Sequence, residues 1–416
     1  MQRKGVYNLK RFDKNSRIKL ALLLGSLAAL GPLTIDMYLP SLPSFPTITQ
    51  DFHTNASLVQ FSLTACLLGL GFGQVIIGPM SDVLGRRKPL LIFLFLYFVA
   101  STFCAFAPTI SMFIVARFTQ GFAAAGGIVI SRAIVRDLYQ GRELTKFFSL
   151  LMLINNLAPI LAPVVGSSIL LFTNWKGVFI TLGFVGILLV TFVSLKLNES
   201  LPEENRVPSN IGQTFRNFLS LIMDRKFLGF ALTQGFISAG IFAYVSGTPF
   251  VYQNIYGTSP QLFSILFAMN GIGIMIGTQV VGRFADTISE IRFLKIGLSL
   301  AMIASSGLLL AVLLKGPLFT VVIPIFFFVS SMGIISTSSF SLAMETQGHI
   351  AGSAAALLGL LPFVLGSISA PLVGIAGEYS ARPMGVLIFC AALFAFLSFY
   401  GLASNSRARV KNKYAS

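Results

Sequence analysis

The sequence predicts an all-α membrane protein in which twelve transmembrane helices form two six-helix halves. Of the 416 residues, 55% are hydrophobic and only 11% are charged, whereas a soluble domain carries about 25% charged residues. Apolar runs of about 20 residues, long enough to cross a bilayer as helices, recur along the whole chain. The longest polar stretch, residues 198–225, divides these runs into six and six.

The twelve expected spans follow one another at short intervals. They are 20–42, 56–78, 89–108, 111–135, 146–171, 177–197, 226–250, 261–282, 292–314, 317–341, 350–375 and 383–404. The first six form an N-terminal half over 20–197 and the last six a C-terminal half over 226–404. Residues 198–225, which include "NESLPEENRVPSN", are predicted to form a cytoplasmic linker. Residues 1–19 and 405–416 are then the N-terminal and C-terminal tails.

The charges predict which side of the membrane each loop occupies. The net charge is +16, and most of the 30 Lys and Arg residues fall in the tails or in alternate loops. An even number of spans places those segments on one side, and basic segments stay in the cytoplasm. Both termini are therefore expected to be cytoplasmic. The basic excess indicates topology and a contact with anionic lipid rather than nucleic-acid binding.

Two loops repeat each other at an offset of 204 residues. "GPMSDVLGRRKPLLIF", residues 78–93, follows the second span, and "GRFADTISEIRFLKIG", residues 282–297, follows the eighth. The alignment pairs Asp82 with Asp286. Two parallel six-helix repeats are a transporter plan, in which a substrate cavity between the halves opens alternately to each side.

The motifs resemble those of the major facilitator superfamily. "GPMSDVLGRRKPL" is similar to the signature of its loop between spans two and three, and "RFTQGFAAAGG" to its span-four signature. "LGPLTIDMYLPSLP", "SRAIVRDLY" and "AGSAAALLGLLPFVLGSISAPLVG" resemble the drug:proton antiporter branch, specifically the Bcr/CflA-type multidrug exporters. The resemblance implies proton-driven multidrug efflux across the bacterial inner membrane by a monomer. It also implies that protons, a small molecule and the lipid bilayer are the partners.

Two other functions stay open from the sequence. The same fold could export one endogenous metabolite, such as a siderophore or an amino-acid derivative. A non-transporting sensor or assembly partner is a further alternative, although the short loops offer no signalling module. The pattern G-x-x-x-x-G-K-[ST] of ATP-driven pumps is missing, and no nucleophile and base lie together as in an enzyme.

Asp36 is the one charged residue between Leu20 and Gln50. An acid at the bilayer centre costs roughly 2.5–3.5 kcal/mol on insertion scales. Asp36 either forms a permanent ion pair or takes up and releases a proton, because desolvation favours its neutral form. Pro32, one turn earlier, leaves a carbonyl unpaired and permits a kink. The resemblance also implies an acid here, and some relatives carry a second acid where this chain has Ala28, so strongly cationic cargo is not favoured.

Arg117 is the base expected deep inside a span on the outer side. Its depth in span four matches that of Asp36 in span one at a rise of 1.5 Å per residue. Arg117 either anchors the helices by bonding backbone carbonyls or responds to protonation of Asp36, directly or through Gln120. In the family that the sequence resembles, the matching arginine is tied to proton coupling.

Charged residues at the predicted cytoplasmic face are candidates for a conformational latch. They are Asp82, Arg86, Arg87, Arg132, Arg136 and Asp286. They either cap helices and fix the topology, or Asp82 pairs with Arg132 or Arg136 in only one of two access states. Exposed ion pairs contribute about 0–1 kcal/mol, which suits a contact that must break. In the second copy "SEI" replaces "GRR", so a second latch at Asp286 is expected to be weaker or lost.

Polar and helix-softening residues complete the candidate site. Pro159, Pro163 and Gly166 resemble the antiporter signature of the fifth span, and either allow close packing or soften the helix. The adjacent amides of Asn155 and Asn156 need partners or water inside a membrane. The candidate substrate-cavity residues are Tyr38, Gln120, Asn155, Asn156, Gln234, Tyr244 and Asn270.

No metal site and no cofactor are expected. His53 and His349 lie at span ends and have no partner at metal-ligand spacing. Cys66, Cys104 and Cys390 fall inside spans without paired spacing, where they act as small buried hydrophobic residues.

Overall fold

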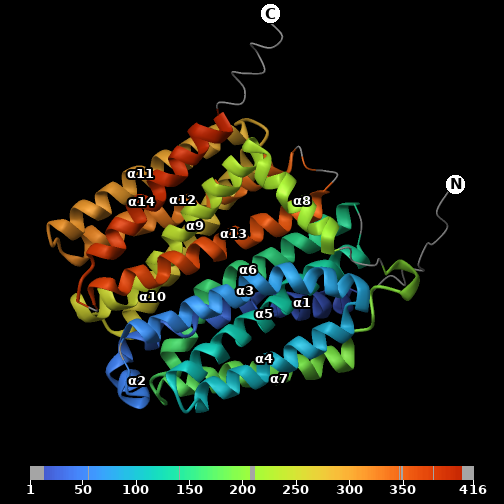
Figure 1. Cartoon of the computed structure of the whole chain (residues 1–416), viewed down its shortest axis with the longest axis horizontal. Coiled ribbons are helices and arrows are strands. Elements are labelled where there is room, and N and C mark those ends of the chain that lie inside the picture. The colour runs from blue at the N-terminus through green and yellow to red at the C-terminus, as the bar shows by residue number, and fades with distance from the viewer. Residues whose placement is uncertain are drawn as a thin grey trace, which may run out of the picture.

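The computed structural model describes residues 14–54, 56–139, 141–206, 211–345, 347, 350–377 and 379–404. These residues form helices joined by short turns, and no strand occurs among them. Figure 1 shows two groups of long helices, one coloured blue to green and the other yellow to red.

In the described part of the chain, the first group, here called the N half, contains six long helices. They are α1 (Lys14–Asp36), α3 (Ala56–Leu84), α4 (Arg87–Phe106), α5 (Ile110–Leu138), α6 (Gly141–Ile169) and α7 (Trp175–Lys196). The second group, the C half, also contains six. They are α9 (Arg225–Phe250), α10 (Pro260–Arg283), α11 (Glu290–Leu313), α12 (Leu318–Met344), α13 (Ala351–Leu372) and α14 (Arg382–Ser398).

Shorter elements connect or extend these helices. They are η1 (Leu39–Ser44), α2 (Phe45–Phe52), η2 (Glu203–Asn205), α8 (Ile211–Met223), η3 (Val251–Ile255), η5 (Val373–Ala376) and η6 (Phe399–Ser404). η1 and α2 follow α1 at one end of the bundle, and α8 crosses the helices at the other end (Figure 1). We call these the α2 end and the α8 end.

Eleven of the described segments are long and apolar enough to cross a membrane. In α6 the apolar part identified among the described residues, Leu153–Ile169, is shorter. An all-helical membrane fold is therefore confirmed, while the twelfth crossing stays a prediction.

Helix packing in the C half repeats that in the N half. α5 packs on α1, α3 and α4, and α12 packs in the same way on α9, α10 and α11. The pairs α1–α6 and α4–α7 correspond to α9–α13 and α11–α14. The halves meet through α3 with α13 and α6 with α10, a pair of contacts that the repeat relates to each other.

Close packing of α3 on α5 depends on two glycines. A methyl group on Gly69 would overlap the carbonyl oxygen of Phe118, and one on Gly121 would overlap the carbonyl oxygen of Cys66. Small residues let membrane helices approach to backbone contact. The "GLGFG" and "RFTQGFAAAGG" stretches therefore set the distance between these two helices.

Two short helices lie outside the expected spans. The segment predicted as a linker, 198–225, contains α8, and α2 follows η1. In α8, Leu221 is 1% exposed whereas Leu219 and Met223 on the opposite side are 52% and 75% exposed. Such amphipathic helices are too short and too polar to stand out as apolar runs.

Candidate functional site

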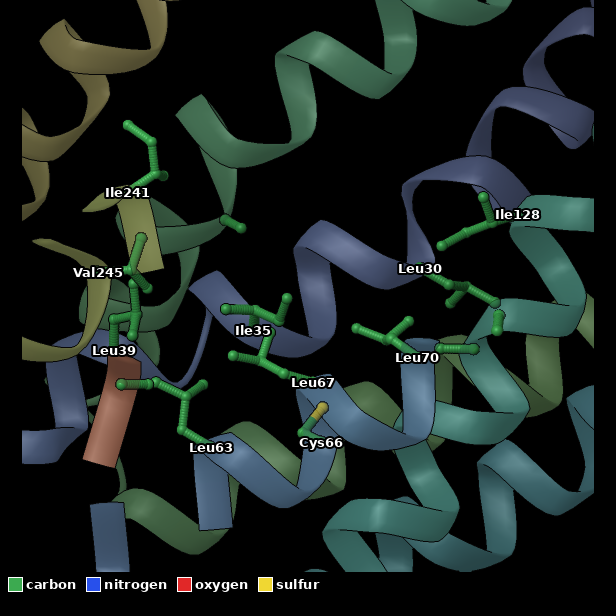
Figure 2. Close-up of a cluster of buried hydrophobic side chains, with 14 of the residues drawn as sticks. Leu30, Ile35, Leu39, Leu63, Cys66, Leu67, Leu70, Ile128, Ile241 and Val245 are labelled. Atoms are coloured by element: carbon green, nitrogen blue, oxygen red, sulfur yellow. The ribbon is translucent and has the colours of Figure 1, made fainter. Parts of the chain in front are cut away.

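Asp36 is the last residue of α1, at the border between the two halves. Its side chain is 7% exposed, and among the described residues it has no hydrogen-bond or ion-pair partner. Figure 2 shows Ile35, the residue before Asp36, between Leu67 of α3 and Val245 of α9, within the buried apolar cluster. A charged carboxylate without a partner is costly in such surroundings. Asp36 therefore avoids this free-energy cost only when its carboxylate binds a proton or a partner of opposite charge.

Local sequence explains why α1 ends here. Pro32 is half-buried inside the helix and cannot donate a backbone hydrogen bond. The Thr34 hydroxyl donates to the Leu30 carbonyl at 2.5 Å and shares a 2.8 Å hydrogen bond with the Tyr97 hydroxyl. The prolines of "LPSLPS" then turn the chain into η1. Asp36 is thus held at a helix end rather than in the middle of a regular helix.

Arg117 lies in α5 beside the same part of α1. The guanidinium is fully buried, and its Nη1 donates to Gln120 Oε1 at 2.5 Å and to the Thr34 carbonyl at 3.3 Å. The guanidinium also lies over the rings of Tyr38 and Phe179, at 5.1 and 5.3 Å.

Within the described part of the chain, Nε and Nη2 of Arg117 have no hydrogen-bond partner. No ion pair joins Arg117 to Asp36 among the described residues. In this conformation Arg117 bonds a backbone carbonyl two residues from Asp36, as the anchoring alternative expects. Gln120 connects it onward, because its Nε2 donates to Ser101 Oγ at 2.8 Å.

Asp36 also lies close to the C half, because η1, which begins three residues later, packs against α9 and α10. Its carboxylate lies within electrostatic range of the Tyr244 hydroxyl in α9. Asn270 of α10 donates to that hydroxyl at 2.8 Å, and the Tyr244 ring stacks on Phe267 at 5.3 Å between centroids. Two residues predicted to line the cavity, Tyr244 and Asn270, are therefore joined to each other and lie near the candidate proton site.

The other predicted cavity residues are distributed more widely. Tyr38 is buried against Arg117, and Gln120 bonds Arg117 rather than facing open space. Gln234 is half-buried, and its Oε1 has no hydrogen-bond partner among the residues that the structure describes. Asn155 is half-buried in α6, while the side chain of Asn156 lies outside the described ones.

The site is closed at the α2 end by η1 and α6. η1 packs against α6, α9 and α10. A methyl group on Gly166 would overlap the Met37 carbonyl oxygen, so this glycine permits close approach of α6 to the chain after Asp36. The Pro163 carbonyl accepts a 3.0 Å hydrogen bond from Ser264 Oγ in the other half. Pro163 and Gly166 thus lie at the contact between the halves, with Pro159 one turn away in α6.

An aromatic cluster holds α2 on the N half. Trp175 Nε1 donates to Asp51 Oδ2 at 3.1 Å, and Lys176 Nζ lies 3.6 Å from the same oxygen. The Trp175 ring contacts Phe113 and Phe179, with centroids 5.6 and 5.9 Å away. Phe179 also contacts the Arg117 guanidinium, so the cluster extends from α2 to this buried arginine.

At the α8 end, the candidate latch residues form a different network from the expected one. Asp82 pairs with Arg86 at 2.6 Å, and Arg86 Nε bonds Asp137 of α5 at 2.8 Å. Arg132 is half-buried and its Nε has no hydrogen-bond partner in the described ranges, whereas Arg136 is exposed.

The two remaining latch candidates are Arg87 and Asp286. Arg87 donates to the Ser194 carbonyl at 2.7 Å, and Asp286 is exposed in the turn after α10. Asp137 was not among the expected residues, although its acidic side chain directly follows Arg136 in "VRDL".

Glu199 also belongs to this network and was not expected from the sequence. Its two oxygens accept the backbone N–H groups of Arg86 and Arg87 at 2.8 and 3.0 Å, at the start of α4. Ser200 Oγ donates to Asp137 Oδ2 at 3.2 Å. The beginning of the linker is therefore fixed to the N half.

Glu199→Gln is expected to lower the free energy of unfolding by about 1 kcal/mol at pH 7, the usual value of a helix cap. Burial acts to raise the pKa of Glu199, but the N–H groups of Leu201, Arg86 and Arg87 outweigh it and hold this pKa below its ordinary value. The stabilisation is then complete above about pH 4.3 and is lost as pH falls through the lower folded-state pKa. Thermal unfolding at several pH values measures it, and Glu203→Gln, on an 86% exposed side chain, is the control. Equal stability of both variants and wild type would contradict the cap.

No group of three or more His, Cys, Asp or Glu residues in the described part of the chain could hold a metal ion.

Comparison with known proteins agrees with this architecture. The family model described as "Major Facilitator Superfamily" matches residues 22–371. An uncharacterized MFS-type transporter, YdgK of Bacillus subtilis, is 56% identical over 93% of this chain and 96% of its own length. A bicyclomycin resistance protein homolog of Haemophilus influenzae is 31% identical over 92% and 96%.

A solved structure shares the fold. It is a bacterial homolog of the human lysosomal transporter Spinster, in an inward-facing and unoccupied conformation. It covers 96% of this chain and 98% of its own, with a TM-score of 0.69 at 16% identity.

Proposed function

Because the chain belongs to the major facilitator superfamily, we propose that it is a proton-coupled exporter of small lipophilic molecules. It crosses the bacterial inner membrane twelve times, works by alternating access as a monomer, and keeps both termini in the cytoplasm. The α8 end is then cytoplasmic and the α2 end faces outward, as the distribution of Lys and Arg indicates.

The observation that carries this proposal is the unpartnered carboxylate of Asp36 at the border of the two halves. A coupling site must lose its proton to one side and regain it from the other. A carboxylate locked in an ion pair would resist that exchange, whereas Asp36 has no cation to hold its charge. Its position at a helix end, between α1 and α9, lets movement of one half against the other change its access.

Protonation acts on the contact between the halves. When Asp36 is neutral, it adds little cost to the apolar packing around η1, and the outer end stays closed. When it is charged, it favours a conformation that admits water or cargo. Arg117, held to α1 through the Thr34 carbonyl, supplies a fixed positive charge near this exchange.

The Asp82–Arg86–Asp137 network acts as the cytoplasmic latch. It joins the end of α3 to the end of α5 through one guanidinium. Asp82 is 44% exposed, so its pair with Arg86 is weak enough to break and reform during the cycle.

The charge content of the spans favours neutral or anionic cargo. Asp36 is the acid deep in the spans, and Arg132 places an unpartnered cation in the inner part of α5. Tyr244 and Asn270 supply polar contacts within an otherwise apolar and aromatic setting. The same balance suits the second candidate function, export of a single metabolite such as a siderophore or an amino-acid derivative.

Expression in a bacterial strain without its own drug exporters tests the proposal. Cells carrying the protein should accumulate less bicyclomycin or less of other lipophilic antibiotics, and a protonophore should remove the difference. Export of one siderophore and of none of the antibiotics would favour the dedicated exporter. Unchanged accumulation of every compound would contradict both functions.

A further inference from the structure

One face of α8 exposes large apolar side chains. Leu219, Ile222 and Met223 are 52%, 46% and 75% exposed, while Leu221 on the opposite side is 1% exposed. The three exposed residues lie within one turn of helix, so they form a continuous patch. We call Leu219, Ile222 and Met223 the α8 face.

Two arginines flank the α8 face. Arg216 lies three residues before Leu219 and is exposed, and Arg225 follows the end of α8 and is exposed as well. An apolar strip with cations at both ends is the pattern of a helix that lies in a membrane surface. α8 also crosses the long helices rather than running beside them, as such a position requires (Figure 1).

α8 is fixed to the C half. Asn217 Nδ2 lies 3.4 Å from Ser353 Oγ of α13. Asp224, which follows α8, accepts the backbone N–H of Lys226 at 2.9 Å and a 2.7 Å hydrogen bond from Gln347 Nε2. A force on α8 is therefore carried to α9 and α13, whereas Glu199 fixes the start of the linker to the N half.

We propose that the α8 face is a binding site for anionic phospholipid. Its three apolar side chains enter the boundary between head groups and acyl chains, and Arg216 and Arg225 bind the head-group phosphates. The basic flanks select anionic over zwitterionic lipid, and the long apolar helices of the same chain place it among lipids. Bound lipid holds the C half in the membrane plane while the N half moves against it.

Fluorescence quenching in liposomes that contain phosphatidylglycerol tests how deeply the α8 face lies in the membrane. A polarity-sensitive dye is attached to Met223→Cys and, as a control at the same end of the bundle, to Ser289→Cys, with wild type giving the background from native cysteines. Nitroxides near the lipid head groups should quench the dye at position 223 at least twofold more than at 289, and iodide should do the reverse. Iodide quenching that is equal at both positions would mean that the face is open to water or to a protein partner, and would overturn the proposal.

Selectivity for anionic lipid is tested by thermal unfolding in detergent. Phosphatidylglycerol should raise the midpoint for wild type by several degrees more than phosphatidylcholine does. The double variant Arg216→Gln/Arg225→Gln should lose at least half of that difference. Arg283→Gln/Arg292→Gln removes the same charge from exposed positions in the neighbouring turn and should keep it. Equal losses in both double variants, or no lipid preference in wild type, would refute a site at α8.

Discussion

Asp36→Asn is expected to abolish proton-driven efflux while leaving the fold intact. Asparagine matches the side chain in size but cannot release a proton, and among the described residues Asp36 makes no ion pair whose loss would unfold the protein. In everted membrane vesicles that carry a proton gradient, the initial rate of drug uptake should fall to the rate measured in vesicles that lack the protein. Asp36→Glu keeps an ionisable group and should retain part of the rate.

Asp51→Asn is the matched control for this experiment. Asp51 of α2 accepts a hydrogen bond from Trp175 of α7, outside the buried site, and is 34% exposed. The same chemical change there should leave the rate within about twofold of wild type, a range expected when no transition-state contact is lost. Normal efflux in Asp36→Asn would remove Asp36 from the mechanism.

Gly121→Val is expected to prevent stable folding. Its Cβ would overlap the carbonyl oxygen of Cys66, a backbone atom that cannot turn aside. Overpacking typically costs about 1–3 kcal/mol and more where backbone must shift, so α3 and α5 should separate. Size-exclusion chromatography of the detergent-solubilised protein should show little monodisperse material.

Gly307→Val is the control for the packing effect. Gly307 lies in α11, and the nearest atom to an added Cβ is a Pro324 ring carbon at 3.8 Å, which is ordinary contact. This variant should elute like wild type. A Gly121→Val protein that elutes and unfolds like wild type would contradict the close α3–α5 packing.

Much of the fold follows from the sequence because membrane helices leave a simple signal. A long apolar run bounded by basic residues has few alternatives in a bilayer, and the expected spans lie within or close to the observed helices. The extra turns of α3 up to Leu84 and of α6 from Gly141 are too polar to extend an apolar run. The amphipathic helices α2 and α8 were not predicted for the same reason.

Residues of the candidate site can be proposed from the sequence, whereas their contacts cannot. Matching depth placed Asp36 and Arg117 at one level, yet depth does not fix how each helix is rotated about its axis. That rotation depends on packing such as Ile128 against Gly31, where an added methyl group would require the end of the Ile128 side chain to shift. It directs Arg117 to the Thr34 carbonyl rather than to Asp36. Partners distant in sequence, such as Glu199 for the backbone of Arg86, have no local signal at all.

The most direct test of the central claim is proton movement during transport. Purified protein is reconstituted into liposomes with a pH-sensitive dye inside, and a proton gradient is imposed. Compounds that the protein exports from cells are then added on the side of the liposome membrane that corresponds to the cytoplasm. Wild type should move protons only when such a compound is present, and Asp36→Asn should move none. Transport of the compound without any proton movement in wild type would contradict the account.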